Sequence, residues 1–162
     1  MAFASTTNAQ VASATTKRTT FHRETEVRTI IRASDSTVWE ILTNADEHPR
    51  WNSTVTSITG RIAPRERIVL RSTLDAKRSF KLQVKEFTPC SRLVWADGKG
   101  QRTYEIRNNG DGTVAFSMRE RIGGFMFPLY AGAIPSFDAS FNAFAADLKR
   151  EAERLEASYH AQ

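Results

Sequence analysis

The sequence has one cysteine in 162 residues, so it cannot form an intramolecular disulfide or a metal site built from several cysteines. Cys90 lies in a turn predicted over residues 88–91, without a histidine nearby in the sequence. A turn cysteine of this kind is more often incidental than catalytic. Such sparing use of cysteine is typical of a reducing compartment, and we expect a cytoplasmic protein.

Histidine is also scarce, and His22, His48 and His160 show none of the spacings that metal sites use. The sequence has no paired nucleophile and base, and it has no glycine-rich loop that opens a helix. Gly98-Lys99-Gly100 fits a hairpin bend instead. We therefore expect no metal and no cofactor.

Long apolar runs are missing as well: no stretch approaches the roughly 20 apolar residues that cross a bilayer, and we expect no transmembrane segment. The formal charge is +5 and the pI about 9.7, yet no run of five Lys or Arg occurs. Basic residues alternate with apolar ones in the strand-like regions. We interpret this charge as a solvated surface and expect no nucleic-acid partner. The sequence leaves the oligomeric state open.

What remains is an ordinary globular composition, with 40% hydrophobic and 25% charged residues. The length favours a single domain, which we place at residues 23–158. Residues 1–22, rich in Ala, Ser and Thr and without an apolar signal region, and residues 159–162 are expected to be disordered tails.

Hydrophobic periodicity predicts one short strand, a helical interruption and then a series of strands. Ser34 is a suitable N-cap for a helix over residues 35–42, and a second short turn over 44–48 is expected to end at Pro49. The strands are predicted over residues 27–31, 53–58, 68–74, 80–84, 93–97, 102–106 and 114–122.

A single apolar stripe then marks a long last helix over residues 134–155, with Pro135 in its first turn. Phe137, Phe141, Phe144 and Leu148 recur at spacings of three and four residues. One strand, a helical interruption, a run of antiparallel strands and a last helix indicate an α+β protein whose curved sheet grips a helix. The inside of such a sheet is where a small molecule could bind.

The joints between these elements resemble those of the START-like (SRPBCC) superfamily, and most of all its polyketide cyclase/dehydrase and lipid-transport group. The resemblance covers about residues 24–157. The motifs that carry it are Ala33-Ser34-Asp35 before Val38-Trp39, Pro49-Arg50-Trp51-Asn52, Pro89 with Leu93-Val94-Trp95, Gly110-Asp111-Gly112-Thr113, Glu120 before Gly123-Gly124, and the Phe-rich last helix.

This resemblance implies a helix-grip fold: a curved seven-stranded antiparallel sheet wrapped around the long C-terminal helix, with two short helices after the first strand. It also implies a cavity between sheet and helix. Members of the superfamily bind lipids, sterols, hormones or polyketides there, and a minority catalyse cyclisation or dehydration. They share no universal catalytic motif, so the fold does not decide the function.

Strand phase places three ionisable side chains on the expected inner face. The predicted hairpins set Asp97 opposite Arg102 and Trp95 opposite Tyr104, and then Arg102 opposite Met118 and Tyr104 opposite Phe116. Asp97, Arg102 and Glu120 would therefore gather near one end of the sheet. Ion pairs are commonly structural, and a salt-bridge cluster is the first interpretation. The second is that Arg102 orients a ligand oxygen while a carboxylate holds it or moves a proton.

Other candidates share this face or frame its entrance. The Tyr104 hydroxyl could donate to a ligand carbonyl, and Ser72 could add a contact, although backbone or water could satisfy either. Aromatic residues such as Trp39 and Phe125 are either lid residues or plain core. The full candidate ligand-binding set is Trp39, Ser72, Leu82, Trp95, Asp97, Arg102, Tyr104, Phe116, Met118, Glu120, Phe125, Phe137, Phe141 and Phe144.

Three functional hypotheses follow. The first is binding of a small hydrophobic ligand that is lipid-, aromatic- or polyketide-like. The second is a cofactor-free enzyme of the cyclase or dehydratase type, with Arg102, Tyr104 and Glu120 as the catalytic residues. The third is a protein-interaction module without a small ligand.

Overall fold

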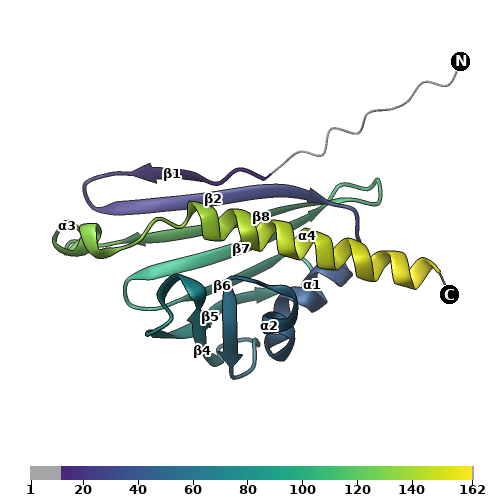
Figure 1. Cartoon of the computed structure of the whole chain (residues 1–162), viewed down its shortest axis with the longest axis horizontal. Coiled ribbons are helices and arrows are strands. Elements are labelled where there is room, and N and C mark those ends of the chain that lie inside the picture. The colour runs from purple at the N-terminus through teal and green to yellow at the C-terminus, as the bar shows by residue number, and fades with distance from the viewer. Residues whose placement is uncertain (1–11, 162) are drawn as a thin grey trace, which may run out of the picture.

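One antiparallel sheet and one long helix make up most of residues 12–161, the part of the chain that the computed structural model describes (Figure 1). Within this range the sheet has eight strands, ordered β1-β2-β8-β7-β6-β5-β4-β3. They are β1 (Thr15–Arg18), β2 (His22–Ile31), β3 (Val55–Thr59), β4 (Arg67–Ser72), β5 (Ser79–Thr88), β6 (Arg92–Ala96), β7 (Gly100–Asn108) and β8 (Val114–Gly123). The sheet curves around α4 (Asp138–His160), so the expected α+β helix-grip fold is confirmed.

The eighth strand is β1, which forms where a disordered tail was expected. Its Lys17 pairs with Glu24 of β2, and the Thr16 hydroxyl donates to Asp138 of α4 at 2.5 Å. Every residue of β1 is exposed, so it lacks the apolar alternation by which a strand is recognised. Of the expected tail 1–22, residues 1–11 lie outside the described residues.

The expected C-terminal tail, residues 159–162, is also partly structured. Helix α4 continues through Tyr159 to His160, and Ala161 is its C-cap. Gln162 lies outside the described residues. The last turn of α4 is exposed, so no apolar stripe marks it in the sequence.

A helical insertion follows β2, made of α1 (Asp35–Thr43), the 3-10 turn η1 (Ala45–Glu47) and α2 (His48–Trp51). As predicted, Ser34 caps α1, its side chain accepting from the Thr37 amide at 3.2 Å. Pro49 does not end the second turn, and that prediction was wrong. It lies in the first turn of α2. Backbone amides in the first turn make no hydrogen bond within the helix, so a proline there costs none.

Helix α4 begins four residues later than predicted, at Asp138. Ile134 is extended, with φ −90° and ψ 119°, because a residue that precedes proline is disfavoured in the helical region. The segment before α4 instead holds the short helix α3 (Phe127–Tyr130) and the 3-10 turn η3 (Ala131–Ala133). The predicted stripe does face the sheet, with Phe141, Phe144 and Leu148 buried.

The hairpin registers differ by two residues from the predicted ones. Arg102 lies opposite Trp95 on β6 and opposite Glu120 on β8, while Tyr104 lies opposite Leu93 and Met118. Because the shift is even, every side chain keeps its predicted face. The turns explain the shift: Asp97 N donates to the Gly100 carbonyl, and Asn109 N donates to the Thr113 carbonyl.

Candidate functional site

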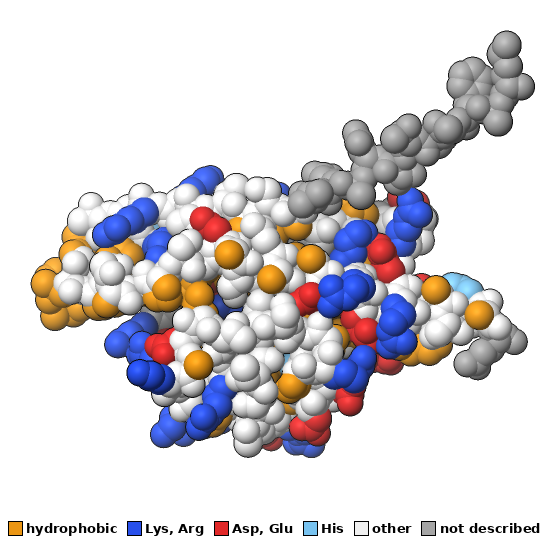
Figure 2. Space-filling view, in the orientation of Figure 1, with side chains coloured by type: hydrophobic (Ala, Val, Ile, Leu, Met, Phe, Trp, Pro, Cys, Tyr) orange, Lys and Arg blue, Asp and Glu red, His pale blue; other side chains and the backbone are white. Residues whose placement is uncertain are grey.

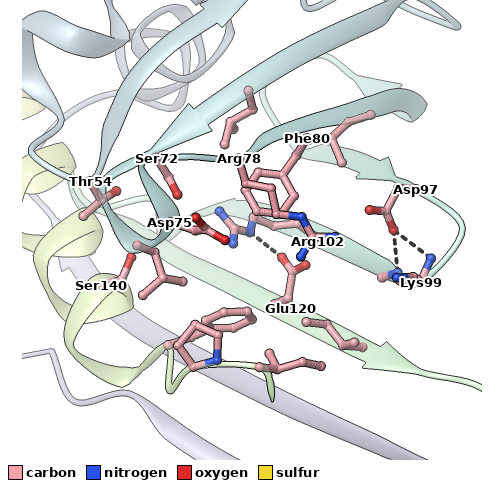
Figure 3. A pocket seen from close by; sticks show the side chains of 18 of the residues that line it. Thr54, Ser72, Asp75, Arg78, Phe80, Asp97, Lys99, Arg102, Glu120 and Ser140 are labelled. Atoms are coloured by element: carbon pink, nitrogen blue, oxygen red, sulfur yellow. Dashed lines mark hydrogen bonds and ion pairs between the residues drawn. The ribbon is translucent and has the colours of Figure 1, made fainter. Parts of the chain in front are cut away.

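A pocket of about 370 Å³ opens between the β3–β6 half of the sheet and the segment that leads into α4 (Figure 3). Its lining is mainly apolar, with a group of charged side chains on the β7–β8 side and around the turns. The residues that line it are Thr54, Val55, Leu70, Ser72, Leu74, Asp75, Arg78, Phe80, Leu82, Trp95, Asp97, Lys99, Gly100, Arg102, Glu120, Ile122, Tyr130, Ala133, Ile134, Pro135, Phe137 and Ser140.

Arg102 and Glu120 form an ion pair in this lining (Figure 3). The Arg102 Nε donates to Glu120 Oε2 at 2.5 Å, and the two side chains are 20% and 15% exposed. The guanidinium also lies over the Phe141 ring, 5.2 Å from its centroid. Burial lowers the pKa of Arg102, but the Glu120 carboxylate and the Tyr104 hydroxyl together more than offset this and raise it above the ordinary value. Arg102 therefore stays a fixed cation.

Tyr104 is buried beside this pair without lining the pocket. Its ring packs edge-on against Trp95 with centroids 5.0 Å apart. Burial raises the pKa of the Tyr104 phenol above its ordinary value, and the adjacent Arg102 cation opposes this only in part. The phenol therefore stays protonated at neutral pH. Its hydroxyl interacts with the Arg102 guanidinium.

Asp97 lines the pocket but does not join the Arg102–Glu120 pair, so the predicted pairing with Arg102 was wrong. Its Oδ1 accepts from the backbone amides of Lys99 and Gly100 at 2.7 and 2.8 Å. The carboxylate is therefore turned toward the β6–β7 turn (Figure 3). Aspartate side chains commonly stabilise turns by accepting hydrogen bonds from backbone amides a few residues ahead. Asp97 stabilises the β6–β7 turn in this way.

Half of the candidate ligand-binding residues line the pocket: Ser72, Leu82, Trp95, Asp97, Arg102, Glu120 and Phe137. The others lie elsewhere. Trp39 packs edge-on against Phe87, with ring centroids 5.0 Å apart. Phe125 is exposed to solvent in the loop after β8. Tyr104, Phe116, Met118, Phe141 and Phe144 are buried in the core.

These buried aromatic residues explain why the pocket occupies only one end of the interior. Phe144 contacts Trp51, Tyr104 and Phe116, with centroid separations of 5.5, 5.7 and 6.4 Å. This cluster fills the space between α4 and the middle of the sheet. The pocket lies at the start of α4, where Phe137 is the first residue of the apolar stripe.

Several lining residues were missed by the sequence analysis. Leu70 and Leu74 share the strand phase of Ser72, and Phe80 shares that of Leu82, so the alternation that revealed Ser72 and Leu82 could have found them. Ile134 and Pro135 were assigned to a helix. No period-two pattern marks Asp75 and the rest of the β4–β5 turn.

Neither a metal cluster nor a membrane-spanning helix occurs among residues 12–161. No group of three or more His, Cys, Asp or Glu side chains in this range is placed to hold a metal ion. None of its helices combines the length and apolarity needed to span a bilayer.

Comparison with solved structures shows the same fold in proteins of low sequence identity. A conserved protein of unknown function from Enterococcus faecalis is 14% identical with a TM-score of 0.64, covering 88% of this chain and 78% of its own. A START superfamily protein from Mycobacterium smegmatis is 15% identical with a TM-score of 0.60, covering 82% and 98%. At 11% identity and a TM-score of 0.59, the di-domain ARO/CYC protein StfQ of the steffimycin biosynthetic pathway covers 88% and 53%.

Sequence comparison gives the family. Among curated proteins, none is a significant match to this chain. A family model does match, that of polyketide cyclase / dehydrase and lipid transport, over residues 22–159. This range takes in the strands β2–β8, the helical insertion and almost all of α4. The chain therefore belongs to the polyketide cyclase/dehydrase and lipid-transport family of START-like proteins.

Proposed function

We propose that the protein binds a small, mostly apolar molecule in the pocket between the sheet and the start of α4, with Arg102 as its polar anchor. The observation that carries this proposal is a cation that Glu120 holds in place within a mainly apolar lining, whose other two cations, Arg78 and Lys99, are exposed. A pocket of about 370 Å³ is within the usual range for small-molecule sites, which combine apolar walls with a few polar groups. Glu120 holds the guanidinium through Nε, so the anchor is oriented before a ligand arrives.

Two fluorescent probes with the same aromatic frame test this proposal. Anilinonaphthalene sulfonate carries an anion, whereas N-phenylnaphthylamine is neutral. Both should bind in the apolar pocket. The double variant Arg102→Gln/Glu120→Gln removes the cation without leaving an unpaired carboxylate. It should weaken binding of the sulfonate about tenfold, the scale of one charge-assisted hydrogen bond, and change binding of the neutral probe little.

A pair of adjacent substitutions on β5 locates the binding. Leu82 lines the pocket, whereas Lys81 is exposed on the opposite side of the strand. Leu82→Trp should fill the pocket and abolish binding of both probes, while Lys81→Trp should leave binding intact. Undiminished binding to a folded Leu82→Trp variant would contradict the proposed site, with folding checked by thermal unfolding.

A second function, catalysis without a cofactor, is favoured by the position of Glu120. Its carboxylate lines the pocket while touching Arg102, so one pair presents both a cation and a proton-accepting group to a bound molecule. Compounds that raise the melting temperature can be incubated with the protein and quantified by mass spectrometry. Recovery of the compounds unchanged supports a binding protein. Loss of a compound that stops with Glu120→Gln supports an enzyme.

A further inference from the structure

Large apolar side chains are exposed together at the end of the molecule that carries α3. Phe125 is 87% exposed, Leu129 77%, Met126 55% and Phe21 52%. Phe21 precedes β2, and the other three lie in the segment after β8, but the two segments meet because Gly124 N donates to the Phe21 carbonyl at 2.9 Å. These four side chains are here named the apolar tip. Figure 2 shows hydrophobic side chains gathered at this end of the molecule.

Basic side chains lie directly behind the apolar tip on two elements. The Arg18 guanidinium of β1 lies over the Phe127 ring, 5.9 Å from its centroid. On the other side, Lys99 Nζ in the β6–β7 turn lies 5.4 Å from the centroid of the Tyr130 ring. Phe127 and Tyr130 belong to α3 and stack edge-on with each other. The two cations thus lie against the rings of α3, next to the exposed apolar side chains of the tip.

We propose that the apolar tip docks on an anionic lipid bilayer, its side chains entering the interface while Arg18 and Lys99 face the headgroups. Apolar side chains backed by Lys and Arg are the arrangement that binds anionic membranes, with apolar groups buried roughly 5–10 Å into the boundary between headgroups and acyl chains. Each basic residue held near an anionic surface adds to the attraction. Exposed apolar side chains that gather beside charged ones mark interaction sites on proteins, and the apolar tip has this arrangement.

The shape and position of the tip favour a bilayer over a protein partner. The tip caps a narrow end of the elongated molecule (Figure 1) and does not form a flat face on its side. Its residues sit in the turn before β2, in the turn after β8 and in the four-residue helix α3, so they form a small cluster and not a broad surface. The same segment continues into Ile134 and Pro135, which line the pocket. Docking would therefore bring the pocket-lining segment to the membrane.

Vesicle flotation of the full chain tests the proposal. Vesicles of phosphatidylcholine mixed with phosphatidylglycerol should carry the protein upward, and vesicles of phosphatidylcholine alone should carry much less. Phe125→Ser/Leu129→Ser should lower the partition coefficient by about tenfold or more, because both side chains lose their burial in lipid. The matched control is Ile30→Ser/Tyr159→Ser, which removes two other exposed apolar side chains from β2 and the end of α4.

Charge is tested separately with Arg18→Gln/Lys99→Gln, which should weaken binding to the anionic vesicles and reduce the effect of added salt. The exposed basic residues Arg107 and Lys81 provide the control variant Arg107→Gln/Lys81→Gln. Equal flotation of the parent and Phe125→Ser/Leu129→Ser would overturn the proposal. The proposal would also be overturned if the parent did not float and eluted from size-exclusion chromatography as a dimer that Phe125→Ser/Leu129→Ser alone dissociates. That result would assign the tip to a second copy of the chain.

Discussion

Arg102 and Glu120 face each other on neighbouring strands, with Arg102 Nε 2.5 Å from Glu120 Oε2. They project from the inner face of the sheet beside Tyr104, and the Arg102 guanidinium lies over the Phe141 ring. Both side chains are largely screened from solvent. Loss of one partner therefore leaves a charge that water hydrates only in part.

Glu120→Gln is expected to destabilise the fold by about 1–3 kcal/mol, because the Arg102 cation loses its partner in a poorly hydrated place. Replacing both residues, as in Arg102→Met/Glu120→Met, should recover most of this loss, since buried ion pairs are often no more stabilising than apolar groups of similar size. Urea unfolding measures the free energies. A double variant that is less stable than Glu120→Gln would show that the pair itself stabilises the fold.

Tyr104 supports the guanidinium and does not line the pocket. Tyr104→Phe is therefore expected to change the affinity for anilinonaphthalene sulfonate less than about threefold, well under the effect of one charge-assisted hydrogen bond. Fluorescence titration of Tyr104→Phe alongside Arg102→Gln/Glu120→Gln gives the comparison. If the two variants lose affinity equally, the hydroxyl contacts the bound molecule directly.

His48 makes stability depend on pH. The imidazole is fully buried, its Nε2 donates to the Leu42 carbonyl at 2.9 Å, and its ring packs on Trp51. Burial lowers the pKa of His48 to about 4, from 6.5. Its contribution to stability is therefore fully present above pH 6.5 and is lost as the pH falls toward 4, because the unfolded chain binds the proton first. The loss should be about 1.4 kcal/mol per pH unit and about 3 kcal/mol in all.

The control for this prediction is His48→Gln, in which an amide can still donate to the Leu42 carbonyl but does not titrate. Urea unfolding between pH 7 and 4.5 should show a steep loss of stability in the parent and a shallow one in the variant. Hydrogen bonds from Arg154 and Arg50 lower the pKa of Glu151 to about 2 from 4.5, so its contribution is lost only below about pH 4.5. Parallel pH profiles of the two proteins would contradict the role of His48.

The sequence predicted the order of elements and the inner face of each strand, because burial on one face imposes a period of two that any even shift of register preserves. Arg102 and Glu120 were therefore placed on the same face even though the predicted partners were wrong. The exact partners depend on the geometry of the turns. In the β6–β7 turn, the Asp97 carboxylate accepts hydrogen bonds from two backbone amides. The pattern of hydrophobic residues does not predict those bonds.

The extent of the pocket was harder to predict than the face that lines it. Phe141 and Phe137 belong to one stripe, yet only Phe137 reaches the pocket, because the aromatic cluster around Phe144 fills the remaining space. Which aromatic residues pack together is a property of the tertiary structure. The strand β1 was missed for a different reason: it is exposed on every residue and is held by polar contacts such as that of Thr16 with Asp138.

Gly123 marks the point where the end of β8 is pressed against the start of β2, and it yields the last prediction. A Cβ on Gly123 would lie 2.5 Å from both the His22 Cβ and the Phe21 carbonyl oxygen, closer than atoms can approach. Gly123→Ala should therefore destabilise the fold by about 1–3 kcal/mol, as overpacking does. It should also disturb the bond from Gly124 N to Phe21.

Gly98 is the matched control, because a Cβ there would meet nothing within 4 Å. Gly98→Ala should leave the free energy of unfolding within about 0.5 kcal/mol of the parent. Chemical denaturation compares the two variants, and hydrogen exchange at the Gly124 amide reports whether the bond to Phe21 has opened. Fast exchange in Gly123→Ala alone would show that this close approach joins the segment before β2 to the loop after β8. Unchanged stability and exchange in Gly123→Ala would mean that the two strand ends separate without cost.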